Sequence, residues 1–158
     1  MDDSLNSIRS NLQRLAEIAK NLRSFGVIRS QRIIPDYGEW IACRILGASL
    51  ADSRTQKGWD VEIAGKRIQV KTHAKALTNR AHRTPIPNHP EYNELLIVVL
   101  TPCYLVSKIF RVPVEDVKRL RKEMGRKWTL EWKELGWFQI QKNKLAAIKP
   151  LLETSTST

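Results

Sequence analysis

Cysteine and long apolar segments are scarce in this 158-residue chain. Its two cysteines, Cys43 and Cys103, are too few for a disulfide scaffold and favour a reducing compartment. No run of about 18 apolar residues is present, so the sequence predicts no transmembrane helix. The opening residues, MDDSLNSIRS, are acidic and polar, which excludes a secretory signal peptide. We therefore expect a cytoplasmic protein with no membrane partner.

Two common kinds of site are also missing. The chain has no GxxxxGK[ST] segment, which argues against nucleotide hydrolysis by a P-loop. Its three histidines, His73, His82 and His89, do not have the spacing with cysteine or histidine that zinc sites require. We expect His82 and His89 on the surface. His73 shares a predicted strand face with other polar residues and fits a supporting role there.

Acidic residues are outnumbered, because 27 Lys and Arg stand against 16 Asp and Glu and give a net charge of +11 and a pI near 10.0. With 42% hydrophobic residues, the composition is that of a folded chain rather than of a disordered basic tail. The length suits a single domain, which we place at residues 1–153, followed by a frayed tail at 154–158. A chain this basic predicts a polyanionic partner, with nucleic acid as the leading candidate.

The positive charge is concentrated after residue 100, where 12 basic and 6 acidic residues lie. One dense basic run spans 118–127, and a second stretch, 71–83, contains no acid. Either stretch alone is compatible with an ordinary solvated surface. Two stretches together with the global excess favour contacts to phosphate groups. The predicted phosphate-contacting residues are Lys75, Arg80, Arg83, Lys118, Arg119, Arg121, Lys122, Arg126 and Lys127.

Apolar residues recur with helical spacing in the N-terminal segment 1–26. They predict an amphipathic helix over residues 4–25, which Gly26 ends. The interpretation we favour is a helix that packs this stripe on the core. The stripe is narrow and heptad-like, so a dimer seam is the alternative. Its members are Leu5, Ile8, Leu12, Leu15, Ile18, Leu22 and Phe25.

The remaining patterns predict helices around a mixed sheet. We expect a second helix at 36–46 after Pro35, a β-hairpin at 58–73 and a polar loop at 74–93. The apolar run 94–100 predicts a strand buried on both faces, and a further strand is expected at 103–111. Pro113 opens a helix at 114–123, residues 126–140 stay unassigned, and 145–152 predict a short final helix. The expected fold class is therefore α/β, with a central mixed β-sheet flanked by helices.

Polar residues with chemical potential gather on the predicted hairpin. Gln69, Lys71 and His73 alternate along its second strand and therefore share one face. Pairing across the short turn brings Asp60 near Gln69 and Lys71. A carboxylate in the middle of a sheet is costly unless it is paired or bound to a metal. A cross-strand Asp60–Lys71 ion pair is the purely structural alternative.

These residues resemble a known motif. Gly58-Trp59-Asp60, followed after eight residues by Gln69-Val70-Lys71, is similar to the bipartite motif of the PD-(D/E)XK nuclease superfamily, which has the restriction-endonuclease-like fold. The resemblance covers about residues 35–111, the catalytic core, and leaves 112–153 as a basic C-terminal part. Glu39, within Tyr37-Gly38-Glu39-Trp40, matches the extra acid that this family often carries on an upstream helix. Gln69 in the second motif position resembles the Mrr-like branch.

The resemblance implies a Mg²⁺-dependent endonuclease that hydrolyses DNA phosphodiester bonds, with Mn²⁺ as a substitute cation. Asp60 would be the principal metal ligand, and Gln69, the Val70 carbonyl and Glu39 would complete the set. The amide of Gln69 is a neutral oxygen donor, which hard cations accept. Lys71 would position the attacking water or stabilise charge in the transition state.

Two further acids near the motif receive other interpretations. Glu62 lies on the same strand face as Asp60; we expect it at an outward position on the rim, with a metal ligand as the alternative. The literal dipeptide Pro35-Asp36 precedes the helix and lies far from the Gln69 strand, so we interpret it as a decoy.

The implied partner is duplex DNA, and the cutting of both strands predicts a homodimer with two active sites. The resemblance suggests a prokaryotic or phage-like setting, in defence against foreign DNA or in the processing of mobile DNA. Two alternatives stay open. The first is a non-catalytic DNA-binding module of the same fold, and the second is a subunit of a larger DNA-processing complex.

Overall fold

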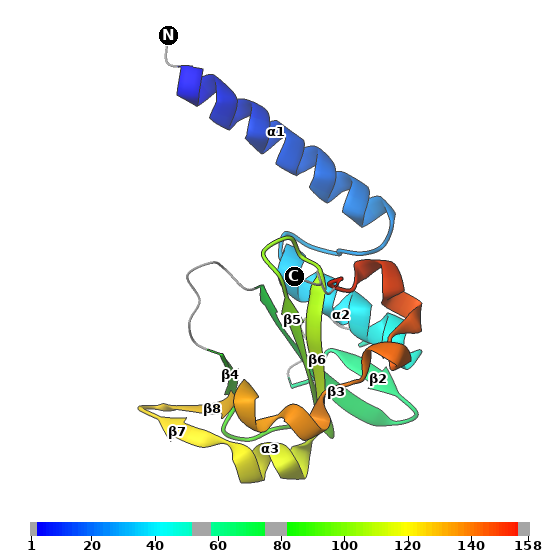
Figure 1. Ribbon diagram of the computed structural model, residues 1–158, viewed down its shortest axis with the longest axis vertical. Coiled ribbons are helices and arrows are strands. Elements are labelled where there is room, and N and C mark those ends of the chain that lie inside the picture. The colour runs from blue at the N-terminus through cyan, green and yellow to red at the C-terminus, as the bar shows by residue number, and fades with distance from the viewer. Residues whose placement is uncertain (1–2, 52–57, 75–81, 155–158) are drawn as a thin grey trace.

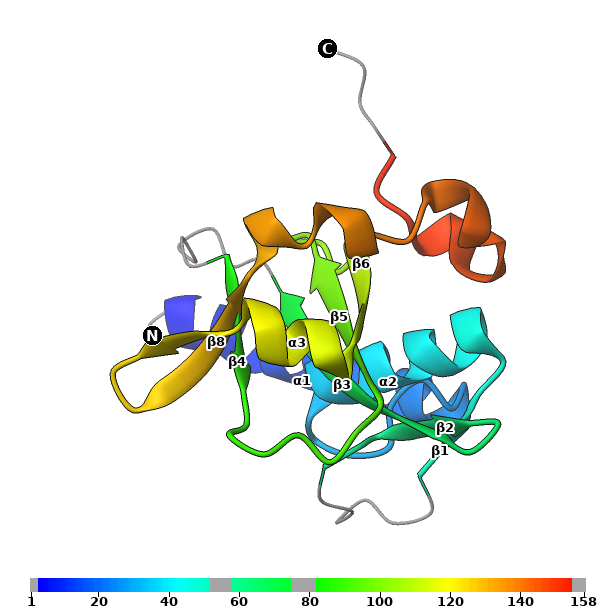
Figure 2. The ribbon, with the colours of Figure 1, turned by 90° about the horizontal axis from the view of Figure 1, so that it is seen from below.

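The computed structural model describes residues 3–51, 58–74 and 82–154 and shows an α/β fold (Figures 1 and 2). A five-stranded mixed sheet has the order β1-β2-β3-β5-β6, and a three-stranded sheet has the order β4-β8-β7. None of the helices in these ranges is long and apolar enough to cross a membrane. The elements, with η for 3₁₀ helices, are α1 (Asp3–Ser24), α2 (Ile33–Leu46), β1 (Ser49–Leu50), β2 (Val61–Ile63), β3 (Lys66–Ala74), β4 (Arg83–Ile86), β5 (Glu94–Leu100), β6 (Val106–Pro113), α3 (Val114–Leu120), β7 (Lys122–Met124), β8 (Lys127–Glu131), η1 (Trp132–Glu134), η2 (Gly136–Phe138), η3 (Lys142–Lys144) and η4 (Ala146–Leu151).

The predicted hairpin is confirmed as β2 and β3. Ile63 pairs with Lys66 across a two-residue turn, Ala64-Gly65, in which both residues have positive φ (48° and 76°). Such a turn matches the twist of the flanking strands. β3 then pairs in parallel with β5, which is the predicted buried strand and lies almost entirely out of solvent. The hairpin is therefore held against the most buried strand of the sheet.

The main sheet is covered on both faces, as Figure 2 shows. On one face α2 packs with the C-terminal 3₁₀ turns over a core that includes Ile41, Ile68 and Leu96. On the other face the small sheet and α3 enclose a second core around Leu95, Ile97 and Leu130. The predicted arrangement of helices around a central mixed sheet is confirmed at this level.

Helix α2 lies unusually close to β3. A Cβ atom at Gly38 would fall 1.7 Å from Thr72 Oγ1, so this contact requires glycine. The helix ends at Gly47, whose left-handed conformation (φ 62°) lets its N–H bond to the Cys43 carbonyl. The close approach brings the next residue, Glu39, up to the hairpin strand.

Three sequence predictions need correction in the middle and C-terminal parts. The polar segment 74–93 is not all loop, because β4 forms within it and pairs with β8. The helix that begins at Val114 ends at Leu120 rather than Glu123, and β7 and β8 follow it as a hairpin. Gly125, with φ 62°, reverses the chain between those strands. The final segment forms 3₁₀ turns, in which Pro150 stands.

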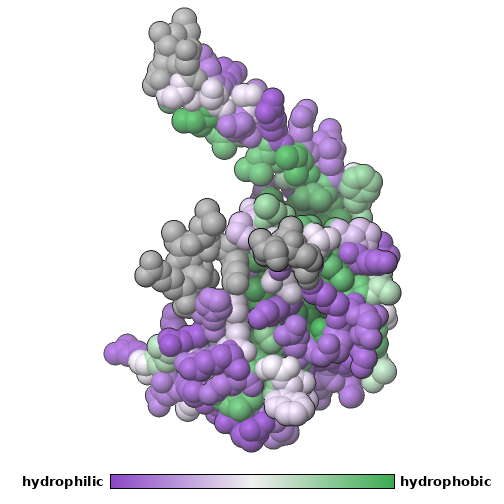
Figure 3. All heavy atoms as spheres, in the orientation of Figure 1, coloured by the Kyte–Doolittle hydropathy of each residue, from purple (hydrophilic) through white to green (hydrophobic). Residues whose placement is uncertain are grey.

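The preferred prediction for α1 is wrong. Its bounds agree with the expected helix, but its apolar stripe does not pack on the core: Leu5, Ile8, Leu12, Leu15 and Ile18 are each 53–63% exposed. Figures 1 and 3 show the helix projecting from the body, with its apolar side chains along one flank.

The glycine at position 38 gives a test of the α2–β3 contact. We expect Gly38→Ala to lower the free energy of unfolding by about 1–3 kcal/mol, because overpacking outweighs alanine's better helix propensity. Urea denaturation of both proteins measures the change. Gly136→Ala is the matched control, since a Cβ there meets nothing within 4 Å. Equal stability of the Gly38 variant and wild type would contradict the contact.

Candidate active site

Asp60 lies directly before β2 and opposite Gln69 of β3. Its backbone N–H donates to the Ile68 carbonyl (2.9 Å) and extends the hairpin by one step. Its Oδ2 accepts the Val70 N–H (2.8 Å) and a hydrogen bond from Gln69 Nε2. The predicted proximity of Asp60 to Gln69 is therefore confirmed, and the carboxylate occupies the hydrogen-bonding edge of β3.

Burial raises the pKa of the Asp60 carboxyl above its usual value. The Val70 N–H and the positive charges of Lys71, Arg32 and Arg29 act in the opposite direction but do not cancel it. Lys71 is thus close enough to act on Asp60 through its charge, as the strand alternation predicts. A half-buried carboxylate of this kind favours the arrival of positive charge.

Glu39 reaches the same place from α2. Its side chain is 14% exposed, and its Oε2 accepts a hydrogen bond from the Arg29 guanidinium. Burial and the negative charge of Asp60 raise the pKa of Glu39, while Arg29 lowers it. The effect of Asp60 on the pKa of Glu39 indicates that the helix and the hairpin bring the two predicted acids near each other.

Arg29 and Arg32 are the members of this cluster that sequence reasoning missed. Both lie in the segment between α1 and α2, and both act electrostatically on Asp60. Asp36, the predicted decoy, lies within the first turn of α2 and not before the helix as predicted. It shapes the segment that precedes α2, because its Oδ2 accepts the N–H groups of Arg29 (2.6 Å) and Ser30 (2.5 Å). An Asp in the first turn of a helix, just after two arginines, was the available signal.

The donor set fits a hard divalent cation with some adjustment. Two half-buried carboxylates that repel each other, a backbone carbonyl and an amide are oxygen donors of the kind that Mg²⁺ accepts. The Gln69 amide now directs Nε2 to Asp60 and to the Val70 carbonyl (3.3 Å), so it must turn to offer Oε1. Within residues 3–51, 58–74 and 82–154, no group of three or more His, Cys, Asp and Glu could hold a metal. A cation here would rely on two carboxylates and neutral oxygens.

Nearby residues lie as follows. Glu62 is exposed on β2, which confirms the expected rim position. Trp59 packs at the border of the second core with the Arg67 guanidinium 3.9 Å from its ring centroid, beside Asp60 in sequence. His82 and His89 are exposed, as predicted. His73 instead is half-buried between the two sheets.

The predicted phosphate contacts divide into several groups. Lys75 and Arg80 lie outside the described residues. Lys118, Arg119 and Lys122 form ion pairs with acids close to them, and Arg83 pairs with Glu131. Arg121 lies over the Trp128 ring and donates to the Asn88 carbonyl. The expected single basic helix is therefore replaced by α3 and the β7–β8 hairpin, with much of its charge neutralised.

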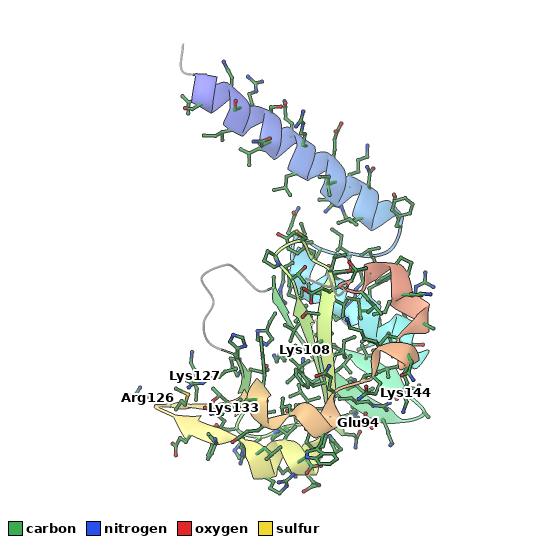
Figure 4. The ribbon with its side chains drawn as sticks, in the orientation of Figure 1. Glu94, Lys108, Arg126, Lys127, Lys133 and Lys144 are labelled. Atoms are coloured by element: carbon green, nitrogen blue, oxygen red, sulfur yellow. The ribbon has the colours of Figure 1, made fainter. Side chains whose placement is uncertain are left out.

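Arg126 and Lys127 differ from these paired residues. They lie exposed at the tip of the β7–β8 hairpin, with Lys133 near its base (Figure 4). The hairpin projects on the side of the molecule away from β2 in both ribbon views (Figures 1 and 2). Lys108 on β6 is a further exposed cation that the sequence clusters did not include.

Comparison with family models and curated proteins supplies no relative whose function could be carried over to this site. No protein-family model matches the chain, and no curated protein sequence matches it either. The assignment of a function therefore depends on the geometry of Asp60, Glu39, Gln69, Val70 and Lys71.

His73 provides a pH-dependent test of how the two sheets are joined. The Trp132 indole N–H donates to Thr84 Oγ1 (2.8 Å), so the Thr84 hydroxyl can donate to His73 Nε2 (3.0 Å). Burial, and then the charge of Lys71, lower the pKa of His73 below 6.5. Below pH 6.5 His73 binds a proton in the unfolded chain that it does not bind in the folded chain. The free energy of unfolding therefore decreases as the pH is lowered.

We expect His73→Gln to lose less stability than wild type between pH 7 and pH 5, both measured by urea denaturation. His89→Gln, at an exposed position, should retain the wild-type pH profile. A His73 variant with an unchanged profile would contradict a buried neutral His73.

Proposed function

We propose that this protein is a Mg²⁺-dependent DNA endonuclease with a restriction-endonuclease-like fold. The observation that carries the proposal is the convergence of Asp60 and Glu39, from separate elements, with the Val70 N–H hydrogen-bonded to Asp60 and Lys71 next on the strand. The mixed sheet with α2 across one face supports the fold assignment at the α/β level.

The residues divide the work of phosphodiester hydrolysis between them. A bound Mg²⁺ supplies an activated water and neutralises charge at the phosphorus. Asp60, Glu39 and the Val70 carbonyl would hold the ion, and Gln69 orients Asp60 through its amide. Lys71 would place the attacking water or stabilise the negative charge of the transition state. Mn²⁺ has similar ligand preferences and is expected to substitute.

Binding of duplex DNA is supported by the net charge of +11 and by exposed cations. Lys108, Arg126 and Lys127 are exposed candidates for phosphate contact in the described part of the chain, and the sequence also predicts Lys75 and Arg80. Arg83, Lys118, Arg119 and Lys122, which the sequence predicts as phosphate contacts, form ion pairs with acids, so we expect fewer phosphate contacts and a shallower dependence on salt than the sequence alone predicts.

The exposed stripe of α1 supports the homodimer. Leu5, Ile8, Leu12, Leu15 and Leu22 keep strict a/d heptad spacing, which is typical of a two-stranded coiled-coil seam. A hollow of about 350 Å³ lies between this stripe and the body, lined by apolar residues of α1, α2 and the segment 103–105 (Figure 3). A long apolar stripe left in water is unfavourable, and a second copy of α1 would cover it.

Plasmid cleavage tests the catalytic assignment. We expect Asp60→Asn and Lys71→Ala to reduce the rate of Mg²⁺-dependent cleavage by about 100-fold or more, because each removes a group that acts on the reacting centre. Glu62→Ala is the matched control, since it removes an exposed carboxylate two residues from Asp60, and it should cleave as wild type does.

Two outcomes would contradict this proposal. Cleavage that survives both substitutions would show that the site lies elsewhere. Salt-sensitive DNA binding without cleavage by the wild type would favour the non-catalytic module, in which Gln69 and Asp60 serve only to join β2 to β3.

Sedimentation tests the dimer seam. We expect the wild type to sediment as a dimer and Leu12→Asp to sediment as a monomer, since a buried charge at the centre of the seam is costly. Gln13→Asp adds the same charge to the polar side of α1 and should remain dimeric. In the cleavage assay the monomer should nick plasmid rather than linearise it. A monomeric wild type would contradict the seam and leave the larger-complex alternative.

A further inference from the structure

Arg29 stands at the candidate metal site without a role in the catalytic motif. Its guanidinium is hydrogen-bonded to Glu39 Oε2, and its charge also acts on Asp60 and Cys43. Its side chain remains 29% exposed, so it lies at the border between the acids and solvent. A cation in this position contacts a candidate metal ligand and is also accessible from solvent, from which a substrate would approach.

The position of Arg29 is built by the surrounding chain. Ile28, the residue before it, is buried with 2% exposure. The N–H groups of Arg29 and Ser30 both donate to Asp36, which is itself 8% exposed at the start of α2. The backbone that carries this guanidinium is therefore anchored on both sides, and α2 carries the Glu39 partner three residues after Asp36.

The contact between Arg29 and Glu39 opposes the binding of a metal. The Asp60 and Glu39 carboxylates repel each other. The Arg29 guanidinium offsets that repulsion because its positive charge lies next to Glu39. A divalent cation would do the same and would require the same carboxylate oxygens. Because two cations repel and compete for one carboxylate, a metal must displace the guanidinium from Glu39.

We propose that Arg29 exchanges partners at this site: it neutralises Glu39 while the site lacks a metal, and it binds a phosphate oxygen of the DNA once the metal has taken Glu39. This inference rests on the proposed function. A guanidinium suits the role because its planar fork of N–H donors matches phosphate as well as carboxylate. The guanidinium that the metal displaces from Glu39 would then bind the phosphate of the substrate.

The exchange predicts effects of opposite sign on two measurements. Titration calorimetry with Mn²⁺ and the full chain, without DNA, should show about tenfold tighter binding for Arg29→Gln, because the competing cation is gone. Cleavage of plasmid by the same variant at saturating Mn²⁺ should fall by about 100-fold, because the phosphate contact is gone. Arg29→Lys should keep Mn²⁺ affinity near that of wild type and recover part of the cleavage. A merely structural role would weaken both measurements together.

Arg44→Gln is the matched control. Arg44 lies on α2 as well, but its guanidinium stacks over Trp40, 5.1 Å from the ring centroid. Its removal should leave Mn²⁺ affinity within about twofold of wild type and cleavage unchanged. Circular dichroism on each variant establishes that α2 remains folded.

The outcomes separate this inference from the proposed function. Wild type that binds Mn²⁺ and cleaves DNA, with an Arg29→Gln variant whose Mn²⁺ affinity is equal or weaker, would overturn the exchange alone. Tighter Mn²⁺ binding by the variant without cleavage by any form would support the competition at Glu39 and overturn the nuclease. Absence of Mn²⁺ binding by wild type and variant alike would overturn both.

Discussion

The approach of two half-buried carboxylates is the constraint on which the rest of this site depends. Asp60 and Glu39 come from the hairpin and a helix, and the negative charge of Asp60 raises the pKa of Glu39. Proteins tolerate such a pair when hydrogen bonds and opposite charges surround it, and functional sites are where such pairs concentrate. Here the surrounding groups are the Val70 N–H, the Gln69 amide and the arginines of the segment before α2.

The backbone makes this arrangement possible at two places. The absent side chain of Gly38 lets α2 lie on β3 and carry Glu39 to the strand edge. β2 begins only at Val61, so the paired part of β3 ends at Ile68 on this side. Beyond that point the Val70 N–H donates to the Asp60 side chain rather than to a strand partner. Together these features leave Asp60 hydrogen-bonded to Gln69 and Val70 and close enough to Glu39 to act on it through its charge, and carboxylate, carbonyl and amide oxygens are the donors that hard cations use.

The N-terminal part of the chain links this site to assembly. The segment that carries Arg29 and Arg32 joins α2 directly to α1, whose apolar stripe faces solvent. The proposed second copy and the proposed exchange at Arg29 thus concern adjacent segments, although they depend on different interactions.

Much of the fold could be predicted from local patterns. The alternation of residues 58–73 predicted the hairpin, and the apolar run 94–100 predicted the buried strand; the register of the hairpin, with Ile63 opposite Lys66, came from the structure. Gly47 and Gly26 marked the ends of α2 and α1. In contrast, the pairing of β4 with β8 joins segments more than 40 residues apart in sequence, and no local pattern indicates it. The end of α3 at Leu120 depends on the pairing of β7 with β8, because the residues that follow Leu120 form β7.

The sequence by itself determined the elements that carry Asp60, Gln69 and Lys71, because strand alternation dictates which side chains share a face. It also determined the excess of positive charge and the apolar stripe on the first helix. Only the tertiary structure decided that the stripe faces solvent, that Lys118, Arg119 and Lys122 of the basic run are paired with acids, and that Arg29 is hydrogen-bonded to Glu39. Those outcomes depend on how whole elements pack, and the distances between them are not encoded in the periodicity of any one segment.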